Sequence, residues 1–165
     1  MNSSLTKIYW DTKLPIYKVS HSKLSKMGIT CLLIDVDGTL LSRNSIIIPK
    51  RVKDWIIKAK EIFDLYLISN NLSEKRIYKI GKELGIKYKY GSQKPRIKKT
   101  LEVINNLNKD KNNIAIIGDR IFTDIIVGNR CKIKTILIQR LNKKGLPLKF
   151  NTTLFFEKFI SLFLF

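Results

Sequence analysis

The sequence predicts an α/β protein built around a doubly wound parallel sheet, and two observations predict it. First, short β-rich segments alternate along the chain with segments whose apolar residues recur at helical spacing. Second, residues 30–35 (TCLLID) are apolar up to a final carboxylate, as is typical of a central strand buried on both faces. Strands that alternate with helices form right-handed βαβ units, so we expect a Rossmann-like sheet.

Each element follows from its own pattern. Two segments show the helix signals most clearly: residues 49–63 place their apolar side chains on one face, and residues 73–84 begin with a capping serine, Ser73, and stop at Gly85. The other two expected helices are residues 96–107 and 122–131. The expected strands are residues 30–35, 65–69, 86–90, 113–117 and 135–139.

Length and composition indicate one globular domain. The chain has 165 residues, of which 44% are hydrophobic, so a disordered protein is excluded. Cys31 and Cys131 are too few for a disulfide scaffold and favour a reducing compartment. Residues 1–13 lack the apolar segment of a signal peptide. We therefore expect a cytoplasmic protein with an extension at residues 1–22, a domain at 23–150 and an apolar helix or tail at 151–165.

The net charge of +19 is open to two interpretations. Summed positive charge attracts nucleic acids, ribosomes and anionic membranes before any specific contact forms. However, 25 of the 32 basic residues are lysines, and the chain also has 26 isoleucines and 12 asparagines. These residues have A/T-rich codons, so the charge is equally explained by a compositional drift, whereas a selected phosphate-binding surface would favour arginine.

Acidic residues follow two of the expected strands. Asp35 and Asp37 follow the strand at 30–35, and Asp119 and Asp124 follow the strand at 113–117. Ligands of such sheets bind at the carboxyl ends of the strands, and converging carboxylates there need a hard divalent cation such as Mg²⁺. The alternatives are a plain acidic turn for the first pair and a helix cap for Asp119.

Three further polar residues occupy the same expected edge. Ser69 ends the strand at 65–69 and Asn70 follows it, so a hydroxyl and free backbone N–H groups are available to bind phosphate oxygens. A turn or helix cap explains Ser69 equally well. Lys94 is one of 25 lysines, and only its place between the second and fourth strands singles it out.

Taken in order, DVDGT, LISNN, Lys94-Pro95 and GDRIFTD resemble the four motifs of the haloacid dehalogenase (HAD) superfamily of phosphatases. The finer resemblance is to YqeG-type phosphatases of subclass IIIA, through Gly28-Ile29, the "SNN" and "LGI" segments, and GDRIFTDIIVGNR at residues 118–130. The likeness runs from about residue 23 to residue 139.

This resemblance implies a role for each matched residue. Asp35 would be the nucleophile that forms an aspartyl-phosphate, and Asp37 the general acid and base. Mg²⁺ would be held by Asp35, the main-chain carbonyl of Asp37 and Asp119, with Asp124 as a ligand or an anchor. The residues that would bind the substrate are Thr39, Ser69, Asn70 and Lys94.

Two residues that differ from the family pattern, and the short intervals between the motifs, bear on substrate specificity. Gly38 and Arg120 stand where many relatives have Asn and Gln, and Arg120 adds a cation that could tune substrate choice or compete for the metal ligand. Only 29 residues separate Thr39 from Ser69, and 24 separate Ser69 from Lys94. Neither interval can hold a cap domain, so we expect an HAD core without a cap, open to large substrates.

The resulting prediction is an Mg²⁺-dependent HAD phosphomonoester hydrolase. Eukaryotic relatives that resemble it are phosphatidylglycerophosphate phosphatases, which favours an anionic lipid as substrate. The alternatives are a phosphatase of a soluble ester and, less favoured, a basic RNA- or ribosome-associated factor.

In the tail, Glu157, Lys158 and Ser161 share one helical face, as in a helix peripheral to a membrane. A last helix packed on the sheet is the other interpretation. The oligomeric state is not indicated.

Overall fold

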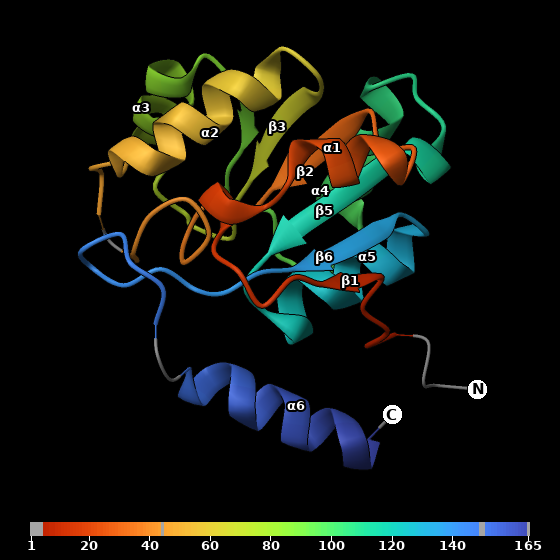
Figure 1. Ribbon diagram of the computed structural model, residues 1–165. Coiled ribbons are helices and arrows are strands. Elements are labelled where there is room, and N and C mark those ends of the chain that lie inside the picture. Colours follow the sequence, from red (N-terminus) through yellow and green to blue (C-terminus); the bar gives the residue numbers. More distant parts are fainter. Residues whose placement is uncertain (1–4, 44, 149–150, 165) are drawn as a thin grey trace.

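The computed structural model describes residues 5–43, 45–148 and 151–164, and in them the chain forms one parallel sheet. The strand order across the sheet is β1-β6-β5-β2-β3-β4, and every neighbouring pair is parallel (Figure 1). The fold class predicted from the sequence is therefore confirmed. The strands are β1 (Trp10–Asp11), β2 (Cys31–Ile34), β3 (Asp64–Ile68), β4 (Lys87–Lys89), β5 (Ile114–Gly118) and β6 (Lys134–Leu137).

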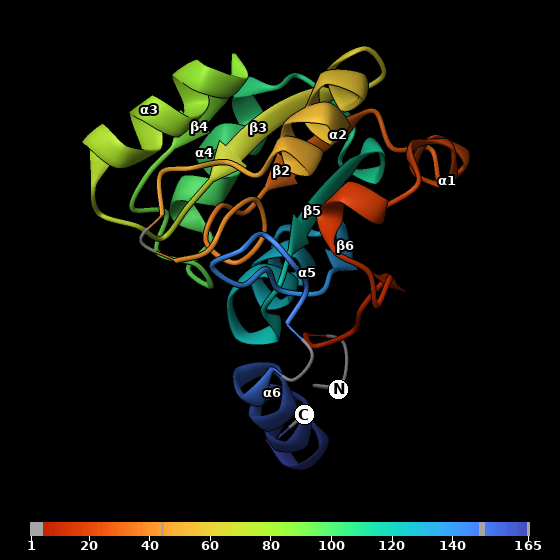
Figure 2. The ribbon, with the colours of Figure 1, turned by 60° about the vertical axis from the view of Figure 1, so that its left-hand side comes forward.

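Helices cover both faces of the sheet (Figure 2). Residues of α1 (His21–Lys26), α2 (Lys50–Lys60) and α3 (Glu74–Leu84) pack into one hydrophobic core, and residues of α4 (Lys98–Asn106) and α5 (Ile126–Cys131) pack into a second. The remaining helical elements are η1 (Ile16–Lys18), η2 (Lys111–Asn113), η3 (Ile121–Ile125) and α6 (Thr152–Leu164).

The central strand β2 divides its side chains between the two cores. Leu32 and Ile34 enter the core under α1–α3, whereas Cys31 and Leu33 enter the core under α4 and α5. Successive side chains of a strand point to opposite faces, so a strand covered on both sides must be apolar throughout. This requirement explains the apolar run seen in the sequence.

Most expected elements are present within one to three residues of their expected limits. The Ser73 hydroxyl caps α3 by accepting a hydrogen bond from the Arg76 N–H, and Gly85 ends α3 in the left-handed conformation with φ of 62°. The helix expected at residues 122–131 differs, because its first turn is the π-helix η3 and only the rest is α-helical.

The strand β1 was not expected. It has two residues, too few to show any alternation, and it pairs with β6 at the edge of the sheet. It lies within residues 1–22, the stretch expected to be an extension. The proposed domain limits themselves stay a prediction.

Because all strands are parallel, their carboxyl ends share one edge of the sheet, where Asp35, Ser69 and Asp119 follow β2, β3 and β5. Among the described residues, the interval from Thr39 to Ser69 holds α2 and β3, and the interval from Ser69 to Lys94 holds α3 and β4. Neither interval forms a second domain, as the spacing predicted. No helix in the described part of the chain combines the length and apolarity needed to cross a membrane.

Candidate active site

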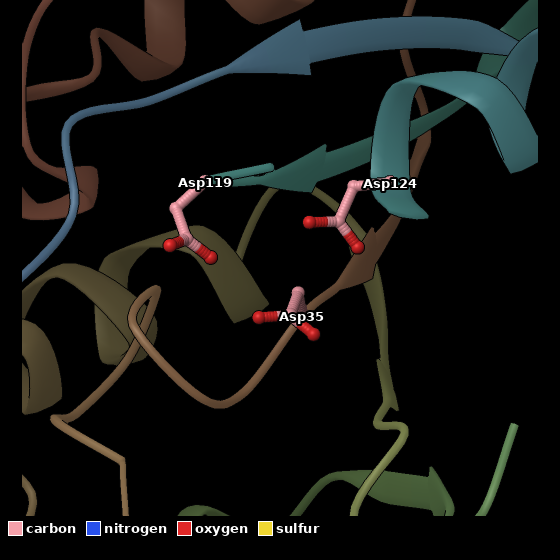
Figure 3. Close-up of side chains that lie close together, drawn as sticks. All are labelled: Asp35, Asp119 and Asp124. Atoms are coloured by element: carbon pink, nitrogen blue, oxygen red, sulfur yellow. The ribbon is translucent and has the colours of Figure 1, made fainter. Parts of the chain in front are cut away.

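Three buried carboxylates converge at the carboxyl edge of the sheet. Asp35 follows β2, Asp119 follows β5, and Asp124 lies in η3 (Figure 3). One oxygen from each lies within 4.8 Å of one oxygen from each of the others. The exposed fractions are 7% for Asp35 and 1% for both Asp119 and Asp124. The sequence therefore placed these three acids correctly at one site.

Two glycines allow the carboxylates to approach the backbone. Gly38 has φ of +95°, and a Cβ atom there would lie 2.6 Å from Oδ2 of Asp119. A Cβ atom on Gly118 would collide with the carboxylate of Asp124. A larger residue at either position would displace an acid of the cluster, so both glycines belong to the construction of the site.

Lys94 lies inside this cluster and is itself 4% exposed. Its ammonium donates to Oδ1 of Asp35 at 2.7 Å, to Oδ1 of Asp124 at 2.6 Å and to the carbonyl of Ile68 at 3.0 Å. All three N–H donors are therefore used. Burial by itself lowers the pKa of Lys94, but the carboxylates of Asp124 and Asp35 outweigh burial and raise the pKa above its ordinary value.

One ammonium does not balance three carboxylates. Desolvation, reinforced by the neighbouring acids, raises the pKa of Asp119 well above its ordinary value. Desolvation also raises the pKa of Asp35 to about 6, against the opposing charge of Lys94. Neither carboxylate oxygen of Asp119 has a hydrogen-bond partner among the described residues. Three hard oxygen donors with an uncompensated negative charge fit a divalent cation of the Mg²⁺ type.

Asp37 stands apart from this cluster. Its two carboxylate oxygens accept hydrogen bonds from both terminal nitrogens of Arg76, at 2.8 and 3.1 Å, in a bidentate ion pair. Arg76 also donates from Nε to the carbonyl of Ser45 at 2.9 Å, and Asn71 donates to Asp37 at 3.4 Å. The side chain of Asp37, which also lines the cleft, is thus held in place by Arg76 of α3.

The loop after β3 organises the phosphate side of the cleft. The Asn70 side chain accepts from Ser92 and from the Lys94 N–H, both at 2.7 Å, and donates to the Lys94 carbonyl at 2.8 Å. Asn70 therefore fixes the backbone that carries Lys94. The Ser69 hydroxyl accepts from the Asn71 N–H at 3.1 Å, as in a turn, and Ser69 also lines the cleft. Its binding of phosphate stays a prediction.

Thr39 does not line the cleft with the other expected substrate-binding residues. It is fully buried, and its hydroxyl has no hydrogen-bond partner among the residues described. Of the residues expected to bind the substrate, the structure brings Ser69, Asn70 and Lys94 to the cleft wall. The role of Thr39 stays a prediction.

The mouth of the cleft carries three arginines, Arg43, Arg120 and Arg140. Arg140 Nε lies 3.5 Å from Oδ2 of Asp119. Arg120, which the sequence placed as a cation beside Asp119, pairs instead with Glu157 at 2.9 Å. The cation that approaches the expected metal ligand is therefore Arg140.

Glu157 anchors α6 beside the site. Its carboxylate accepts from Nε of Arg120 at 3.0 Å and from the Ile121 N–H at 2.8 Å, and it is 3% exposed. Phe156 is 60% exposed on the same helix. The polar face expected from Glu157, Lys158 and Ser161 is therefore not the solvent-exposed face of α6 throughout. Glu157 on that face is buried against the domain, whereas phenylalanines of the same helix are exposed.

Sequence reasoning missed Arg76, Arg140 and Glu157. Arg76 lies in the first turn of α3, where the helix dipole disfavours a cation. An arginine at such a position suggests an anionic partner nearby, and this was the one signal in the sequence that could have indicated its pairing. For Arg140 and Glu157 no local signal exists, because their partners lie 21 and 37 positions away in the chain.

Comparisons with known proteins agree with this geometry. Residues 3–140 match the family described as mitochondrial PGP phosphatase. The chain is 28% identical over 137 residues to the Bacillus subtilis (strain 168) protein named Probable phosphatase YqeG, covering 82% of this chain and 80% of that protein.

Solved structures share the fold. One is a protein from Listeria monocytogenes serotype 4b, with a TM-score of 0.57 and 20% identity, covering 75% of this chain and 84% of the other. Another is 3-deoxy-D-manno-octulosonate 8-phosphate phosphatase from Yersinia pestis, with a TM-score of 0.50 and 19% identity, covering 73% of this chain and 69% of the other. With the family match covering most of the chain, the protein belongs to the mitochondrial PGP phosphatase family and is a phosphoric monoester hydrolase of the HAD type.

Proposed function

We propose that this enzyme hydrolyses phosphatidylglycerophosphate through an aspartyl-phosphate intermediate and uses Mg²⁺. The substrate rests on one observation, the family match over residues 3–140. The chemistry rests on the buried cluster of Asp35, Asp119, Asp124 and Lys94. A cleft without a cap domain supports a substrate as large as a phospholipid head group.

In the first step, an oxygen of Asp35 attacks phosphorus, an Asp35–phosphorus bond forms, and the bond from phosphorus to the ester oxygen breaks. Burial raises the pKa of Asp35 to about 6, which is still below neutral pH, so the nucleophile is largely ionised. Lys94 holds the Asp35 carboxylate at 2.7 Å and brings positive charge to the transferring phosphoryl group. Ser69 and the loop fixed by Asn70 line the same cleft and would bind phosphoryl oxygens.

Asp37 would move the protons. As general acid it gives a proton to the leaving ester oxygen, and in the second step it takes a proton from the water that attacks phosphorus and frees Asp35. The bidentate ion pair with Arg76 fixes where the Asp37 carboxylate lies before the reaction. One of these two hydrogen bonds has to open when the acid is protonated, because a protonated carboxyl accepts fewer bonds.

The metal would be held by Asp35, Asp119 and the main-chain carbonyl of Asp37, with Asp124 as a ligand or an anchor. The orphaned oxygens of Asp119 and the excess of carboxylates over ammonium groups support this assignment. Bound there, Mg²⁺ would supply positive charge to the phosphoryl oxygens and to the developing negative charge of the leaving group.

The test is release of phosphate from a panel of esters with and without Mg²⁺. The panel holds phosphatidylglycerophosphate, phosphatidic acid, glycerol 3-phosphate and 4-nitrophenyl phosphate. We expect the highest kcat/KM for phosphatidylglycerophosphate, and we expect Asp35→Asn to lower turnover of every ester by at least about 10⁴-fold while the circular dichroism spectrum is kept. Turnover retained in Asp35→Asn would refute the nucleophile, and equal rates for all esters would refute the lipid substrate.

We also propose that the substrate is met at an anionic membrane surface. Phe155, Phe156 and Phe159 on α6 are each more than half exposed, and the net charge is +19. Exposed aromatic side chains beside a basic surface favour contact with anionic lipid, and the electrostatic part of that contact weakens as salt screens it.

Flotation with vesicles tests this surface. The full chain is expected to float with phosphatidylglycerol vesicles and not with phosphatidylcholine vesicles, and Phe156→Ser is expected to float less. A filter-binding titration with RNA addresses the other explanation of the charge. Strong RNA binding that falls steeply with salt, together with no turnover of phosphatidylglycerophosphate, would overturn the lipid proposal.

A further inference from the structure

A second cavity shares Arg140 with the catalytic cleft and has four apolar side chains among the ten residues that line it. This cavity, which we call the α6 groove, has a volume of about 270 Å³ and is lined on its apolar side by Ile138, Leu148, Leu154 and Phe155. The catalytic cleft has a volume of about 140 Å³, and its lining contains no purely apolar side chain among the residues described. The two cavities therefore differ completely in the chemistry that they offer to a ligand.

Arg140 lines both cavities, so the two lie on either side of this one side chain. The backbone around Arg140 is fixed, because its carbonyl accepts from the Leu148 N–H at 2.8 Å and its neighbour Gln139 donates to the Leu148 carbonyl at 3.0 Å. These bonds hold Gln139 and Arg140, which follow β6, against Leu148.

The groove carries more positive than negative groups at its rim. Lys13, Arg140 and Lys158 line it together with a single acid, Asp11. Asp11 is already paired with Lys158 at 3.2 Å. Lys13 adds positive charge at the groove, and Arg140, which lies 3.5 Å from Asp119, places positive charge between the groove and the cleft. This order of groups matches a phosphomonoester, then a second anionic group, then a hydrocarbon chain.

We propose that the α6 groove binds the apolar chain of the substrate and that Arg140 binds a second negative charge of the substrate, such as a phosphodiester, next to the ester that is hydrolysed. This inference rests on the proposed phosphatase function and deepens it. It commits the groove to one occupant, part of the substrate itself, because Arg140 lines both the groove and the catalytic cleft.

Arg140 then has two partners in turn. In the structure its Nε lies 3.5 Å from Oδ2 of Asp119, longer than a good hydrogen bond. A phosphodiester oxygen would offer a planar guanidinium a better, bidentate partner. Binding of the second anion would therefore draw Arg140 toward the substrate and away from the acidic cluster.

Three water-soluble esters separate the parts of this proposal. 4-Nitrophenyl phosphate has neither a second phosphate nor an alkyl chain, glycerophosphoglycerol phosphate has the second phosphate alone, and dihexanoyl phosphatidylglycerophosphate below its critical micelle concentration has both. All three are used as monomers, so contact between α6 and a membrane does not enter the measurement.

Phe155→Ser tests the groove, and Phe156→Ser is its matched control. Both residues are exposed positions of the same helix, but only Phe155 lines the groove. For Phe155→Ser we expect the ratio of kcat/KM for the dihexanoyl lipid to kcat/KM for glycerophosphoglycerol phosphate to fall about tenfold, mainly through KM. For Phe156→Ser we expect the wild-type ratio.

Arg140→Gln tests the second anion. Here we expect kcat/KM for both esters with two phosphates to fall about tenfold relative to 4-nitrophenyl phosphate. Equal ratios in Phe155→Ser and Phe156→Ser, or a wild-type enzyme with no preference for the dihexanoyl chains, would overturn the groove while leaving the phosphatase function intact. Failure of the wild-type enzyme to hydrolyse any of the three esters would overturn the proposed function itself, and the groove with it.

Discussion

Two groups of charged side chains at the site differ in charge balance and in burial. The cluster of Asp35, Asp119 and Asp124 is almost fully buried and holds three carboxylates. Against them stand the ammonium of Lys94 and, 3.5 Å from Asp119, the guanidinium of Arg140, so one negative charge is left over. Asp37 and Arg76 form a balanced pair whose side chains are 20% and 10% exposed. The first group is incomplete without a cation, whereas the second is complete as it stands.

This difference separates two kinds of function. A buried group that is short of positive charge costs folding free energy, and it is retained where a metal or a substrate supplies the missing charge. A balanced, bidentate pair costs little and holds one geometry. The chain therefore keeps the acids expected to bind a metal in a high-energy arrangement and its expected proton-transfer residue in a low-energy one. The following predictions test that contrast.

The largest effect is expected for Asp119→Asn. Loss of one ligand charge should lower activity with Mg²⁺ by about 10³-fold or more. In EDTA, however, the variant should be more stable than the wild type, with Tm raised by about 2–5 °C, because an uncompensated buried charge is removed. Calorimetry in EDTA and in Mg²⁺ measures both. Asp54→Asn, an exposed acid of α2, is the control, and a lower Tm of Asp119→Asn in EDTA would contradict the comparison.

Arg76→Ala is expected to have the next largest effect. Without the bidentate partner Asp37 is no longer oriented, so kcat for glycerol 3-phosphate should fall about 10- to 100-fold. The fall should be smaller for 4-nitrophenyl phosphate, whose leaving group needs little protonation. Arg76→Lys, which cannot form two parallel bonds, should restore only part of the loss. Lys75→Ala, an exposed residue of the same helix turn, is the control. Equal losses for the two esters would argue against an action through Asp37.

Stability of the metal-free protein should depend on pH through the acidic cluster. The pKa of Asp35 is raised from 3.8 to about 6 and that of Asp119 is also raised well above its ordinary value, so the folded protein keeps protons that the unfolded chain has released. This contribution to stability is complete below about pH 4 and is lost as the pH rises through about 6. Because Mg²⁺ competes with those protons, the gain in Tm on adding Mg²⁺ should be several degrees larger at pH 7 than at pH 5. A rise in Tm on adding Mg²⁺ that is the same at both pH values would contradict this titration. In Asp119→Asn, the difference between the rise at pH 7 and the rise at pH 5 should be smaller than in the wild type.

The smallest effect is expected at the ion pair between Glu157 of α6 and Arg120, which lies outside both groups compared above. Glu157→Gln keeps the shape of a buried group but removes its charge, which should weaken the attachment of α6 by about 1–3 kcal/mol. We expect faster proteolysis between the domain and α6, with kcat/KM for 4-nitrophenyl phosphate changed by less than about threefold. Lys158→Gln, which removes an exposed ion pair with Asp11, is expected to leave the rate of proteolysis near that of the wild type.

Local pattern predicted the strands and most of the site. The apolar run of β2, the Ser73 cap and the Gly85 stop depend on neighbouring residues, and each was predicted from the sequence. Asp35, Asp119 and Lys94 could be placed together because the carboxyl ends of parallel strands share one edge. The two-residue strand β1 could not be predicted, since its only support is pairing with β6.

The sequence by itself determined the alternation of strands and helices, the acids at the strand ends and the lack of room for a cap domain. Only the tertiary structure decided which charges meet. Arg76 reaches Asp37 across 39 positions, Arg120 turns to Glu157 rather than Asp119, and Arg140 lines both the cleft and the α6 groove. The physical reason is that hydrophobic periodicity reports which face of an element is buried, whereas the partner of a long charged side chain depends on which elements the fold brings within its reach.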